Sequence, residues 1–562
     1  MKNLFGFKLV LLSTISIYSY GCKDQKTIEQ NRPNILYIMC DDHSYQTISA
    51  YGSEVSKLAP TPNIDRLASE GMLFDHAFVE NSLSAPSRAC LMTGLYSHQN
   101  GQKQLCEGID TTKTFFTELL HDNGYETGIV GKWHLMCEPK GFDYYHILDD
   151  QGKYYNPTFK SKETHGQYVQ EKGYATSLIT QHAIEFLDHR DKSKPFCLMV
   201  HHKAPHRNWM PEQKYLDLYE DVEFPVPATF WDDYETRGVA AHKQKLNIAN
   251  AMEMAQDLKV PELCDTTTAE GHFSYVCLMG ELGRLTPEER AAWDKHYGPR
   301  NKKLLEAKLT GKELTVWKYQ NYMKDYLRCI KSVDDSVGEL LAYLEKEGLL
   351  DNTIIVYTSD QGFWMGEHGW FDKRFMYEES FRTPLLIRYP EAIKASSRCS
   401  RLVQNIDFAP TLLDVAGVKV PKQMEGHSLV PLFGENRDKV EWRKSIYYHY
   451  YDYPTFHLVR RHDGVRTDRY KLIHFYGKGG EAGASPNMLK SGTRENRIFN
   501  MLKKANYFPA NSEDINYNEL YDLEKDPHEL NNLYGKPGYE KITTELEVLL
   551  NEYRKQLNIK EF

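Results

Sequence analysis

Acidic and amide side chains follow two short apolar runs of this sequence, at the points where the corresponding strands would end. Asp41 and Asp42 follow the run NILYIMC, and Asp360 and Gln361 follow the run TIIVYTS. A pair of adjacent aspartates that stands alone is commonly a turn or a helix cap. Three carboxylates that meet in space repel one another and raise a pKa unless a cation neutralises them. Carboxylate and amide oxygens favour Ca²⁺ or Mg²⁺ as that cation, although the many histidines of the chain keep Zn²⁺ as an alternative.

Two further apolar runs are followed by basic or imidazole side chains. Lys132 and His134 follow the run ETGIVG, and the segment HHKAPHRNW at residues 201–209 follows the run PFCLMV. Taken singly, such residues more often have an ordinary structural role. Four strand ends with charged or metal-ligating groups nevertheless indicate one shared site, because open α/β sheets bind ligands beyond the carboxyl ends of their strands.

The segment NSLSAPSRACLMTG, which includes Ser84, is typical of a short helix. Pro86 suits the first turn and Gly94 suits the stop, so Ser84 is expected at the helix N-terminus. An isolated Ser-x-Pro is ordinarily only a helix cap, but helix N-termini also favour anions. Arg88 would add a guanidinium fork that matches a tetrahedral oxyanion if its side chain turns to the same pocket.

The apolar runs alternate with helical stretches such as TPNIDRLASEGMLF and ITQHAIEFLDHR, and this alternation predicts a mainly parallel α/β sheet flanked by helices. The segment near 225–320 is rich in helix formers and predicts a helical insertion that walls the cleft. Tyrosine-rich alternation beyond it, followed by an amphipathic last helix, predicts a small antiparallel sheet. We therefore expect a catalytic domain at 30–435 and a smaller α+β subdomain at 436–562.

The bulk composition excludes one large class of function. The chain has 562 residues, of which 41% are hydrophobic, and its net charge is −9. It therefore lacks the whole-molecule positive field that nucleic-acid-binding proteins usually show, and we predict no nucleic-acid partner. A local cluster of Lys and Arg can still bind an anion in one cleft.

The N-terminus MKNLFGFKLVLLSTISIYSYGC resembles a bacterial lipoprotein signal, with Lys2, an apolar stretch and small residues before Cys22. The stretch is too short and too polar at its ends for a membrane-spanning helix. We expect cleavage of the signal at 1–22 before a lipidated Cys22, with a plain secretory signal as the alternative. The protein would then be an exported lipoprotein, in the periplasm or on the surface of a Gram-negative bacterium, that contacts the membrane only through its lipid anchor.

The motif SAPSR at residues 84–88, followed by Thr93-Gly94, resembles the signature of the type I sulfatases of the alkaline phosphatase superfamily. In that family the leading Cys or Ser is converted to formylglycine after translation. The resemblance extends through PNILYIMCDD, APTPNIDRLASEGMLFDHAF, GKWH, YTSDQGFWMGEHGWFDKRF and ELYDLEKDPHELNNL, and so covers most of the mature chain. It implies an alkaline-phosphatase-like fold for the large sheet.

The resemblance also implies a mechanism. Ser84 would be converted to formylglycine by a serine-type maturase, and the hydrate of the aldehyde would supply the nucleophilic oxygen. One ion, Ca²⁺ rather than Mg²⁺, would contact the modified residue and would be bound by Asp41, Asp42, Asp360 and Gln361. The residues that neutralise the sulfate oxygens would be Arg88, Lys132 and Lys373. His134 would orient or deprotonate the hydrate.

One position departs from the family pattern. Several sulfatases have a His directly before Ala-Pro or Lys-Pro in the third strand-end motif, whereas this chain has Lys203 there, with His202 before it and His206 after it. The leaving group would be protonated by Lys203, His206 or His202, in this order of preference. Gln361 in place of the commoner Asn preserves the carbonyl ligand.

The segment KAPHRNW is similar to the Ala-Pro-His-x-x-Trp segment of N-acetylglucosamine-6-sulfatases. The resemblance therefore implies an exo-acting enzyme that removes 6-O-sulfate from N-acetylglucosamine of heparan- or keratan-type glycans. The residues expected to contact the sugar are His202, His368, His449 and His457. The alternatives are a glycosaminoglycan sulfatase of 2-O, 4-O or N-acetylgalactosamine 6-O specificity, a phosphonate or phosphate ester hydrolase, and an inactive glycan-binding protein.

Overall fold

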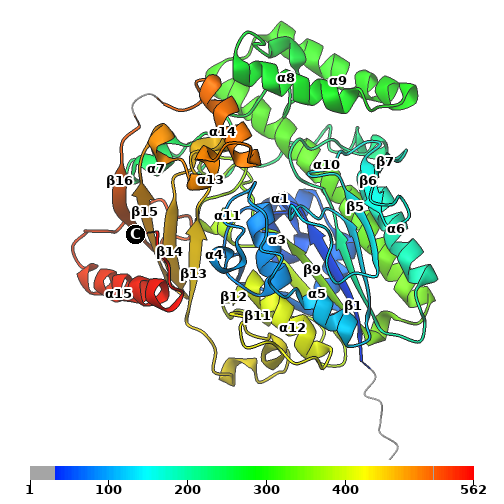
Figure 1. Cartoon of the computed structure of the whole chain (residues 1–562). Helices are drawn as coiled ribbons and strands as arrows, with labels where there is room; N and C mark the ends of the chain where they lie inside the picture. Colours follow the sequence, from blue (N-terminus) through cyan, green and yellow to red (C-terminus); the bar gives the residue numbers. More distant parts are fainter. Residues whose placement is uncertain (1–31, 510–511, 562) are drawn as a thin grey trace, which may run out of the picture.

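A computed structural model describes residues 32–509 and 512–561 of the chain, so the expected signal at 1–22 lies outside the described residues. The dominant element is a ten-stranded sheet with the order β11-β2-β10-β9-β1-β8-β4-β5-β6-β7 (Figure 1). Its strands are β1 (Asn34–Cys40), β2 (Met72–Phe74), β4 (Glu126–Gly131), β5 (Tyr144–Leu148), β6 (Thr158–Ser161), β7 (Tyr168–Gln170), β8 (Phe196–His201), β9 (Thr353–Ser359), β10 (Leu385–Arg388) and β11 (Ser397–Cys399).

Five neighbouring strands in this sheet, β9, β1, β8, β4 and β5, run parallel. Every residue of β1, β8 and β9 is buried, which explains why their sequences are continuous apolar runs without alternation. The register pairs Cys40 with Ser359 and Met39 with His201, so the polar residues that follow these strands start at one edge of the sheet. The prediction of a mainly parallel sheet is confirmed, although β10 runs antiparallel to β9.

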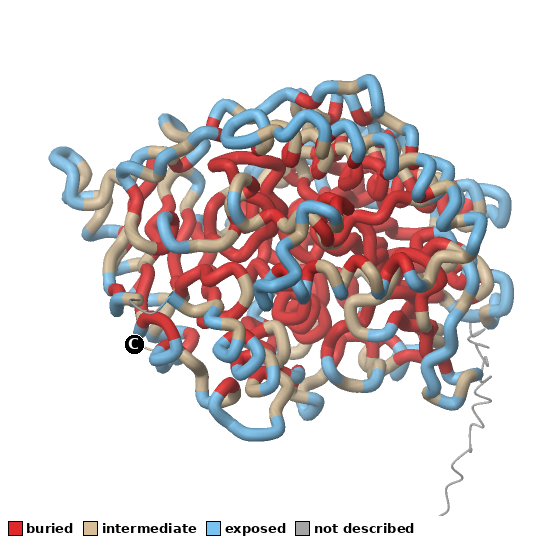
Figure 2. The backbone as a smooth tube through the Cα atoms, turned by 90° about the horizontal axis from the view of Figure 1, so that it is seen from above, coloured by how far each residue is buried: buried red, intermediate tan, exposed pale blue. Residues whose placement is uncertain are grey.

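Helices cover both faces of this sheet. Leu36 and Ile38 of β1 pack into one apolar cluster with α2, α6 and α10, whereas Ile35 and Tyr37 pack into a second cluster with α3, α5 and α12. Figure 2 shows the resulting distribution, with buried backbone in the centre and exposed backbone at the periphery. These helices are α2 (Pro62–Ser69), α3 (Ser84–Thr93), α5 (Phe116–Asp122), α6 (Ala175–His189), α10 (Gly311–Lys346) and α12 (Phe408–Val415).

The segment between β8 and α10 contains α7 (Val239–Lys243), α8 (Ala269–Leu282) and α9 (Pro287–Ala307). Residues 240–259 belong to the segment near 225–320 whose helix formers predict a helical insertion, but beyond α7 this stretch forms no further α-helix. The backbone there pairs with distant segments instead, since Lys245 N donates to His457 O and Ile248 N donates to Gly369 O. Tertiary hydrogen bonds thus override helix propensity and tie this segment to the neighbourhood of the strand ends.

A separate antiparallel sheet has the order β13-β14-β15-β16, and α15 packs on β14 and β15 (Figure 1). The predicted C-terminal antiparallel sheet with a terminal helix is confirmed. Its elements are β13 (Ser445–Tyr450), β14 (His462–Thr467), β15 (Tyr470–Gly477), α13 (Pro486–Leu489), α14 (Arg494–Lys504), β16 (Ile515–Asp522) and α15 (Glu540–Gln556).

The remaining short elements join these layers. β3 pairs with β12 in a two-stranded sheet beside the large one. These short elements are α1 (Glu54–Leu58), β3 (Ala77–Phe78), α4 (Ser97–Asn100), α11 (Glu378–Phe381) and β12 (Val403–Gln404). Within residues 32–509 and 512–561, no helix combines the length and the apolar character needed to cross a bilayer.

Candidate active site

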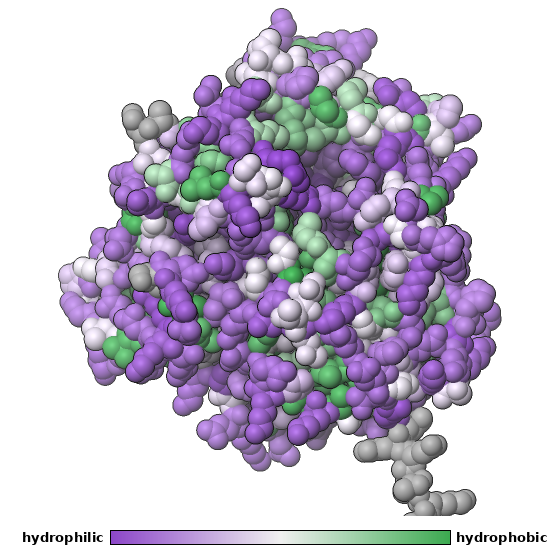
Figure 3. Space-filling model, viewed as in Figure 1, coloured by the Kyte–Doolittle hydropathy of each residue, from purple (hydrophilic) through white to green (hydrophobic). Residues whose placement is uncertain are grey.

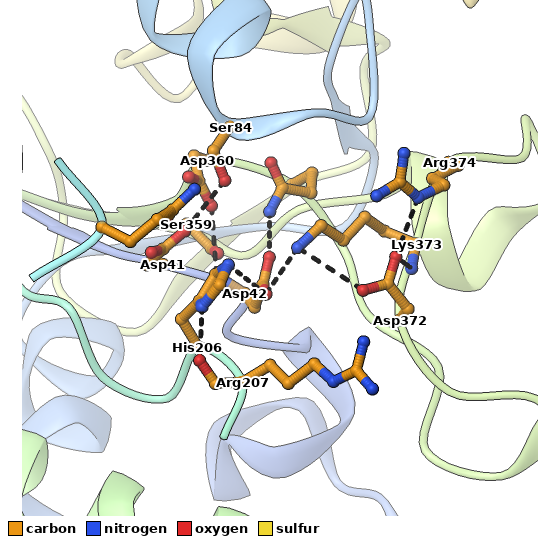
Figure 4. A network of polar contacts seen from close by, with 12 residues as sticks. Asp41, Asp42, Ser84, His206, Arg207, Ser359, Asp360, Asp372, Lys373 and Arg374 are labelled. Carbon is orange, nitrogen blue, oxygen red and sulfur yellow. Dashed lines mark hydrogen bonds and ion pairs between the residues drawn. The ribbon is translucent and has the colours of Figure 1, made fainter. Parts of the chain in front are cut away.

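Three carboxylates meet at the carboxyl ends of β1 and β9 (Figure 4). Asp41, Asp42 and Asp360 are at most 1% exposed. Asp42 has a left-handed backbone conformation with φ of 70°, which is uncommon for a residue other than glycine. Its N–H donates to Asp360 Oδ1 at 3.1 Å, and Asp360 N–H donates to Cys40 O at 3.1 Å. The two strand ends are therefore locked together with their acidic side chains facing one another.

The chemistry of this cluster fits a hard divalent cation. Gln361 Nε2 donates to Asp42 Oδ1, while Gln361 Oε1 is buried and has no hydrogen-bond partner. Burial, together with the charges of Asp41 and Asp360, raises the pKa of Asp42 to about 7 against the attraction of Lys373. A cation would relieve this repulsion and satisfy the amide oxygen. Because these donors are oxygens, they fit Ca²⁺ or Mg²⁺ better than Zn²⁺.

Ser84 is the first residue of α3, and its side chain points at the carboxylate cluster. Ser84 Oγ donates to Asp41 Oδ1 at 2.9 Å, so it does not cap its own helix. The start of α3 is anchored to β9 because Ser87 Oγ donates to Asp360 O. The helix ends as the sequence predicts, at Gly94 with φ of 64°. A helix N-terminus, with its favourable field for anions, therefore faces the acidic cluster and the space around it.

Two buried lysines bring positive charge to the carboxylates. Lys132 Nζ donates to Asp41 Oδ2, and Lys373 Nζ donates to Asp42 Oδ2 at 2.6 Å. Burial alone would raise the pKa of Asp41, but Lys132 and other nearby cations hold it well below its ordinary value. Burial would likewise lower the pKa of Lys373, but Asp372 and Asp42 raise it above its ordinary value. Lys373 therefore stays charged although it is buried.

Arg88 lies in the same cluster, and its donors are committed to protein groups. Its Nε and Nη2 donate to Asp360 Oδ2 at 3.1 and 3.0 Å, and its Nη1 donates to Lys132 O at 3.0 Å. The side chain is 1% exposed. This geometry makes Arg88 the residue that fixes Asp360 and joins the end of β4 to the end of β9.

His134 follows the end of β4, where Gln151 and Asp150 contact it. Gln151 Oε1 accepts from Lys132 Nζ at 2.6 Å, and Gln151 Nε2 lies 3.2 Å from His134 Nε2. Burial lowers the pKa of His134 well below its ordinary value, and the charge of Lys132 lowers it further. Sequence reasoning missed Gln151, although it stands three residues after a strand, because the run YYHIL of β5 is too polar to be singled out.

The three candidates for leaving-group protonation have different surroundings. His206 Nδ1 donates to Arg207 O at 2.6 Å, and His206 Nε2 lies 3.7 Å from Asp42 Oδ2, so the second ring nitrogen faces the cluster (Figure 4). Burial and neighbouring lysines hold the pKa of His206 well below its ordinary value, with Asp41 opposing them.

Lys203 lies three residues before His206 in the same loop. Its Nζ donates to Gln151 O at 3.2 Å and lies 4.8 Å from the centre of the Tyr154 ring, and burial lowers its pKa to about 8. His202 is fully buried, and its Nε2 hydrogen-bonds Ser336 Oγ of α10 at 3.2 Å. The prediction that His202 contacts substrate or leaving group is therefore corrected, because its side chain is packed between β8 and α10.

Two of the histidines predicted to bind the sugar lie outside the cluster. His368 Nδ1 contacts Asp232 Oδ2 at 2.6 Å, and its ring packs among tryptophans. His449 contacts Tyr447 Oη at 2.9 Å and Tyr476 Oη at 2.6 Å inside the C-terminal sheet. Both side chains are fully buried, so they have no surface to offer a sugar, and both predictions are corrected.

His457, the fourth predicted sugar contact, is placed beside charged residues that sequence reasoning did not single out. His457 Nε2 lies 3.5 Å from Asp372 Oδ2 and 3.5 Å from Arg207 Nη1. Arg374 Nε donates to Asp372 Oδ1 at 3.1 Å, and Arg207 is held by Asp257. The only sequence signal for Asp372, Arg374 and Arg207 is that they are direct neighbours of Lys373 or His206.

A cavity of about 680 Å³ opens next to this charged group. Its walls come from the segment around α7, from α8, from α14 and from the loop before β14. Figure 3 shows the recess in the surface below α8 and beside α14. The residues that border it include Arg207, Lys245, Phe273, Phe456, His457 and Tyr507. Arg207 and His457 therefore belong both to this cavity and to the charged group beside the carboxylate cluster.

Comparisons with known proteins agree with this geometry. Residues 33–418 match the family described as Sulfatase, and residues 366–483 and 499–556 match "N-sulphoglucosamine sulphohydrolase, C-terminal". The chain is 45% identical over 563 residues to an N-acetylglucosamine-6-O-sulfatase of Bacteroides thetaiotaomicron, with 99% of this chain and 92% of the relative covered. It is 27% identical to human N-acetylglucosamine-6-sulfatase over 75% of this chain and 67% of the relative.

A solved structure gives the same result in three dimensions. It is the complex of a protein with its substrate D-glucosamine-2-N,6-O-disulfate, and it matches with a TM-score of 0.83 and 46% identity. The match covers 94% of this chain and 99% of the other. With a family match over more than half of its length and a close relative along nearly all of it, the chain belongs to the sulfatase family.

Proposed function

We propose that the protein is an exo-acting sulfatase that hydrolyses the 6-O-sulfate ester of N-acetylglucosamine in heparan- or keratan-type glycosaminoglycans. The observation that carries this proposal is the contact of Ser84 with Asp41 inside a buried cluster of carboxylates and lysines. This arrangement brings together a nucleophile precursor, a cation site and positive charge. Two similar proteins support the sugar and the position of the sulfate. One is an N-acetylglucosamine-6-O-sulfatase, and the other is seen in complex with its substrate D-glucosamine-2-N,6-O-disulfate.

In this proposal one Ca²⁺ would be held by Asp41, Asp42, Asp360 and the unpartnered Oε1 of Gln361. When bound, the ion would act as a Lewis acid on the sulfate and on the nucleophile. Formylglycine made from Ser84 by a serine-type maturase supplies, as its hydrate, a better nucleophile than a serine hydroxyl at its ordinary pKa. Arg88 positions Asp360 for this site through its two hydrogen bonds to Oδ2.

The residues of the chain then divide the remaining tasks. Lys132 and Lys373 stabilise the charge on the sulfate oxygens, because both ammonium groups already face the carboxylates in a water-poor site. His134 accepts a proton at residue 84. Its imidazole is neutral because burial lowers its pKa, and its Nδ1 is buried without a hydrogen-bond partner.

We further propose His206 as the general acid for the sugar oxygen. Its Nδ1 is anchored to Arg207 O, so Nε2 is held facing the cluster. Lys203 is the alternative, but its ammonium is directed to the Gln151 carbonyl and the Tyr154 ring. A negatively charged sulfate and leaving oxygen near His206 would favour its protonated form in the complex.

The cavity beside the cluster is proposed as the sugar site. Its volume of about 680 Å³ falls in the range of about 300–1,000 Å³ that is typical of ligand pockets. Arg207 and His457 line this cavity, and Asp372 and Arg374 lie beside His457, so these four residues would provide donors and acceptors for ring substituents. Phe273, Phe456 and Tyr507 provide aromatic faces for the sugar rings farther out.

The division of the chain and its destination also remain proposals. We propose a catalytic domain at 30–435 with an insertion near 225–320 that walls the cavity, and a C-terminal subdomain at 436–562. Export with a signal at 1–22 and lipidation of Cys22 fits a substrate that is an extracellular polymer.

The first prediction concerns Ser84 in protein purified from the native host. Mass spectrometry of the peptide that contains Ser84 should show the loss of two hydrogens, because formylglycine is the oxidised form of serine. Protein made in a host without a serine-type maturase is the control, and it should be inactive with an intact serine. An active native preparation in which Ser84 is unmodified would contradict the proposal.

The second prediction concerns the metal. Chelation should abolish sulfate release and added Ca²⁺ should restore it, because the cation removes the repulsion among three buried carboxylates. Asp42→Asn should lower kcat/KM by about 10³-fold or more, since a metal ion supplies several kcal/mol of charge stabilisation. Asp217→Asn, at an aspartate with a 90% exposed side chain, is the matched control. Full activity in the presence of chelator would remove the cation from the mechanism.

The third prediction separates His206 from Lys203. His206→Ala should lower kcat on N-acetylglucosamine-6-sulfate by about 10²–10⁴-fold, which is the usual contribution of a general acid. The same variant should lose far less activity on 4-nitrophenyl sulfate, because that leaving group departs without a proton. Lys203→Ala is the parallel variant, and a selective loss there instead of in His206→Ala would transfer the role to Lys203.

The fourth prediction tests the substrate. Rates of sulfate release should be highest for N-acetylglucosamine-6-sulfate and glucosamine-2-N,6-O-disulfate. The rates should be lower by at least about 10²-fold for N-acetylgalactosamine-6-sulfate and for 2-O- and 4-O-sulfated sugars, because a misplaced hydroxyl leaves buried polar groups unpaired. Phosphate and phosphonate esters complete the panel. A preference for any of these other compounds would overturn the assignment.

A further inference from the structure

A second group of metal-ligating side chains lies at the β5–β6–β7 edge of the large sheet, on residues distinct from the carboxylate cluster. His146 is on β5, Glu171 directly follows β7, and His182 is on α6. His146 Nε2 contacts Glu171 Oε1 at 2.6 Å, and His182 Nε2 contacts Glu171 Oε2 at 2.7 Å. One nitrogen of each histidine and a carboxylate oxygen of Glu171 thus lie within 4.8 Å of one another.

The surroundings of these three residues restrict their orientation. Both imidazole side chains are about nine-tenths buried, and their rings stack with centroids 3.6 Å apart. The Phe159 ring contacts both of them. The other ring nitrogen of His182, Nδ1, contacts Glu185 Oε2 at 2.7 Å. A carboxylate on the far nitrogen of a histidine is the partner that commonly orients metal-bound imidazoles.

We propose that His146 Nε2, His182 Nε2 and Glu171 form a binding site for one divalent transition-metal ion of the zinc class. Two imidazoles and a carboxylate are a donor set typical of Zn²⁺, whereas Ca²⁺ takes oxygen donors. The site therefore does not compete with the oxygen-rich active site for the same ion. The Glu171 side chain is 26% exposed, which leaves an approach from solvent for the ion and for a water as the fourth ligand.

The size of the group is close to what such an ion needs. Ligand atoms about 2.1 Å from a tetrahedral zinc are separated from one another by roughly 3.4 Å. The present nitrogen-to-oxygen distances of 2.6 and 2.7 Å must therefore open by about 0.7 Å. Side-chain rotations of that size are available because Glu171 lies in a loop and is the only one of the three that is not buried.

The position of the site gives the ion a mechanical role. It would join β5, the end of the β6–β7 hairpin and α6, three elements that lie within residues 144–189 of the chain. β5 leads directly to Asp150 and Gln151, which contact His134 and Lys132 of the active site. The bound ion would therefore stabilise the strand that delivers these two contacts, without touching the substrate.

The test measures metal binding by the full chain with Ca²⁺ present in excess. Metal-free protein should bind one equivalent of Zn²⁺, measured by isothermal titration and by elemental analysis after gel filtration. His146→Ala and His182→Ala should each remove this equivalent, while Asp42→Asn should keep it. His189→Ala, at an exposed histidine on the same helix, is the matched control and should also bind one equivalent. Glu185→Ala should weaken binding by about 10–100-fold, the usual effect of losing such an orienting partner.

A spectroscopic measurement decides the question even if a histidine variant fails to fold. Co²⁺ added to the wild-type protein should give the intense visible absorption of a four-coordinate site, and Glu171→Gln, which keeps the size and hydrogen-bonding capacity of the side chain, should reduce it. The proposal is overturned if wild-type protein takes up no Zn²⁺ beyond that lost in Asp42→Asn. It is equally overturned if His146→Ala and His182→Ala both fold and bind zinc as the wild type does.

Discussion

The mutual repulsion of Asp41, Asp42 and Asp360 is the constraint on which the rest of the site depends. Three carboxylates with almost no solvent contact are stable only if positive charge reaches them from all sides. Lys132, Arg88 and Lys373 come from three different segments of the chain and supply that charge. Each of these cations is itself buried, so the loss of either the acids or the cations would leave a buried charge without compensation.

This mutual dependence explains why the fold is built as it is. A parallel sheet ends several strands at one edge, so residues that are hundreds of positions apart in sequence start their loops side by side. The pairing of β1 with both β8 and β9 places three of the four strand-end motifs in contact range. The segment around α7, together with α8, α14 and the loop before β14, then encloses a cavity of sugar-binding size next to the charged group that lies beside the carboxylate cluster.

Much of this arrangement could be predicted because local sequence patterns indicate the strands and helices that form it. Central parallel strands are buried on both faces, so β1, β4, β8 and β9 are visible as apolar runs. α3 is marked by Pro86 in its first turn and by Gly94 directly after its last residue. What could not be predicted is where a long polar side chain points. His202 packs against α10, His449 lies inside the C-terminal sheet, and Gln151 reaches the site from a strand with no apolar signature. These outcomes depend on tertiary neighbours that no local pattern specifies.

The burial of α3 has a consequence for the order of events during biosynthesis. All ten residues of this helix are buried, and Ser84 is 2% exposed against Asp41. In the proposed mechanism, an enzyme that oxidises Ser84 could not reach it once α3 has packed on the face of the large sheet. Modification and folding would therefore compete in time, and a chain that folded first would keep an unmodified serine at position 84. The fraction of active molecules in a preparation would then equal the fraction of chains in which Ser84 was modified before α3 was buried.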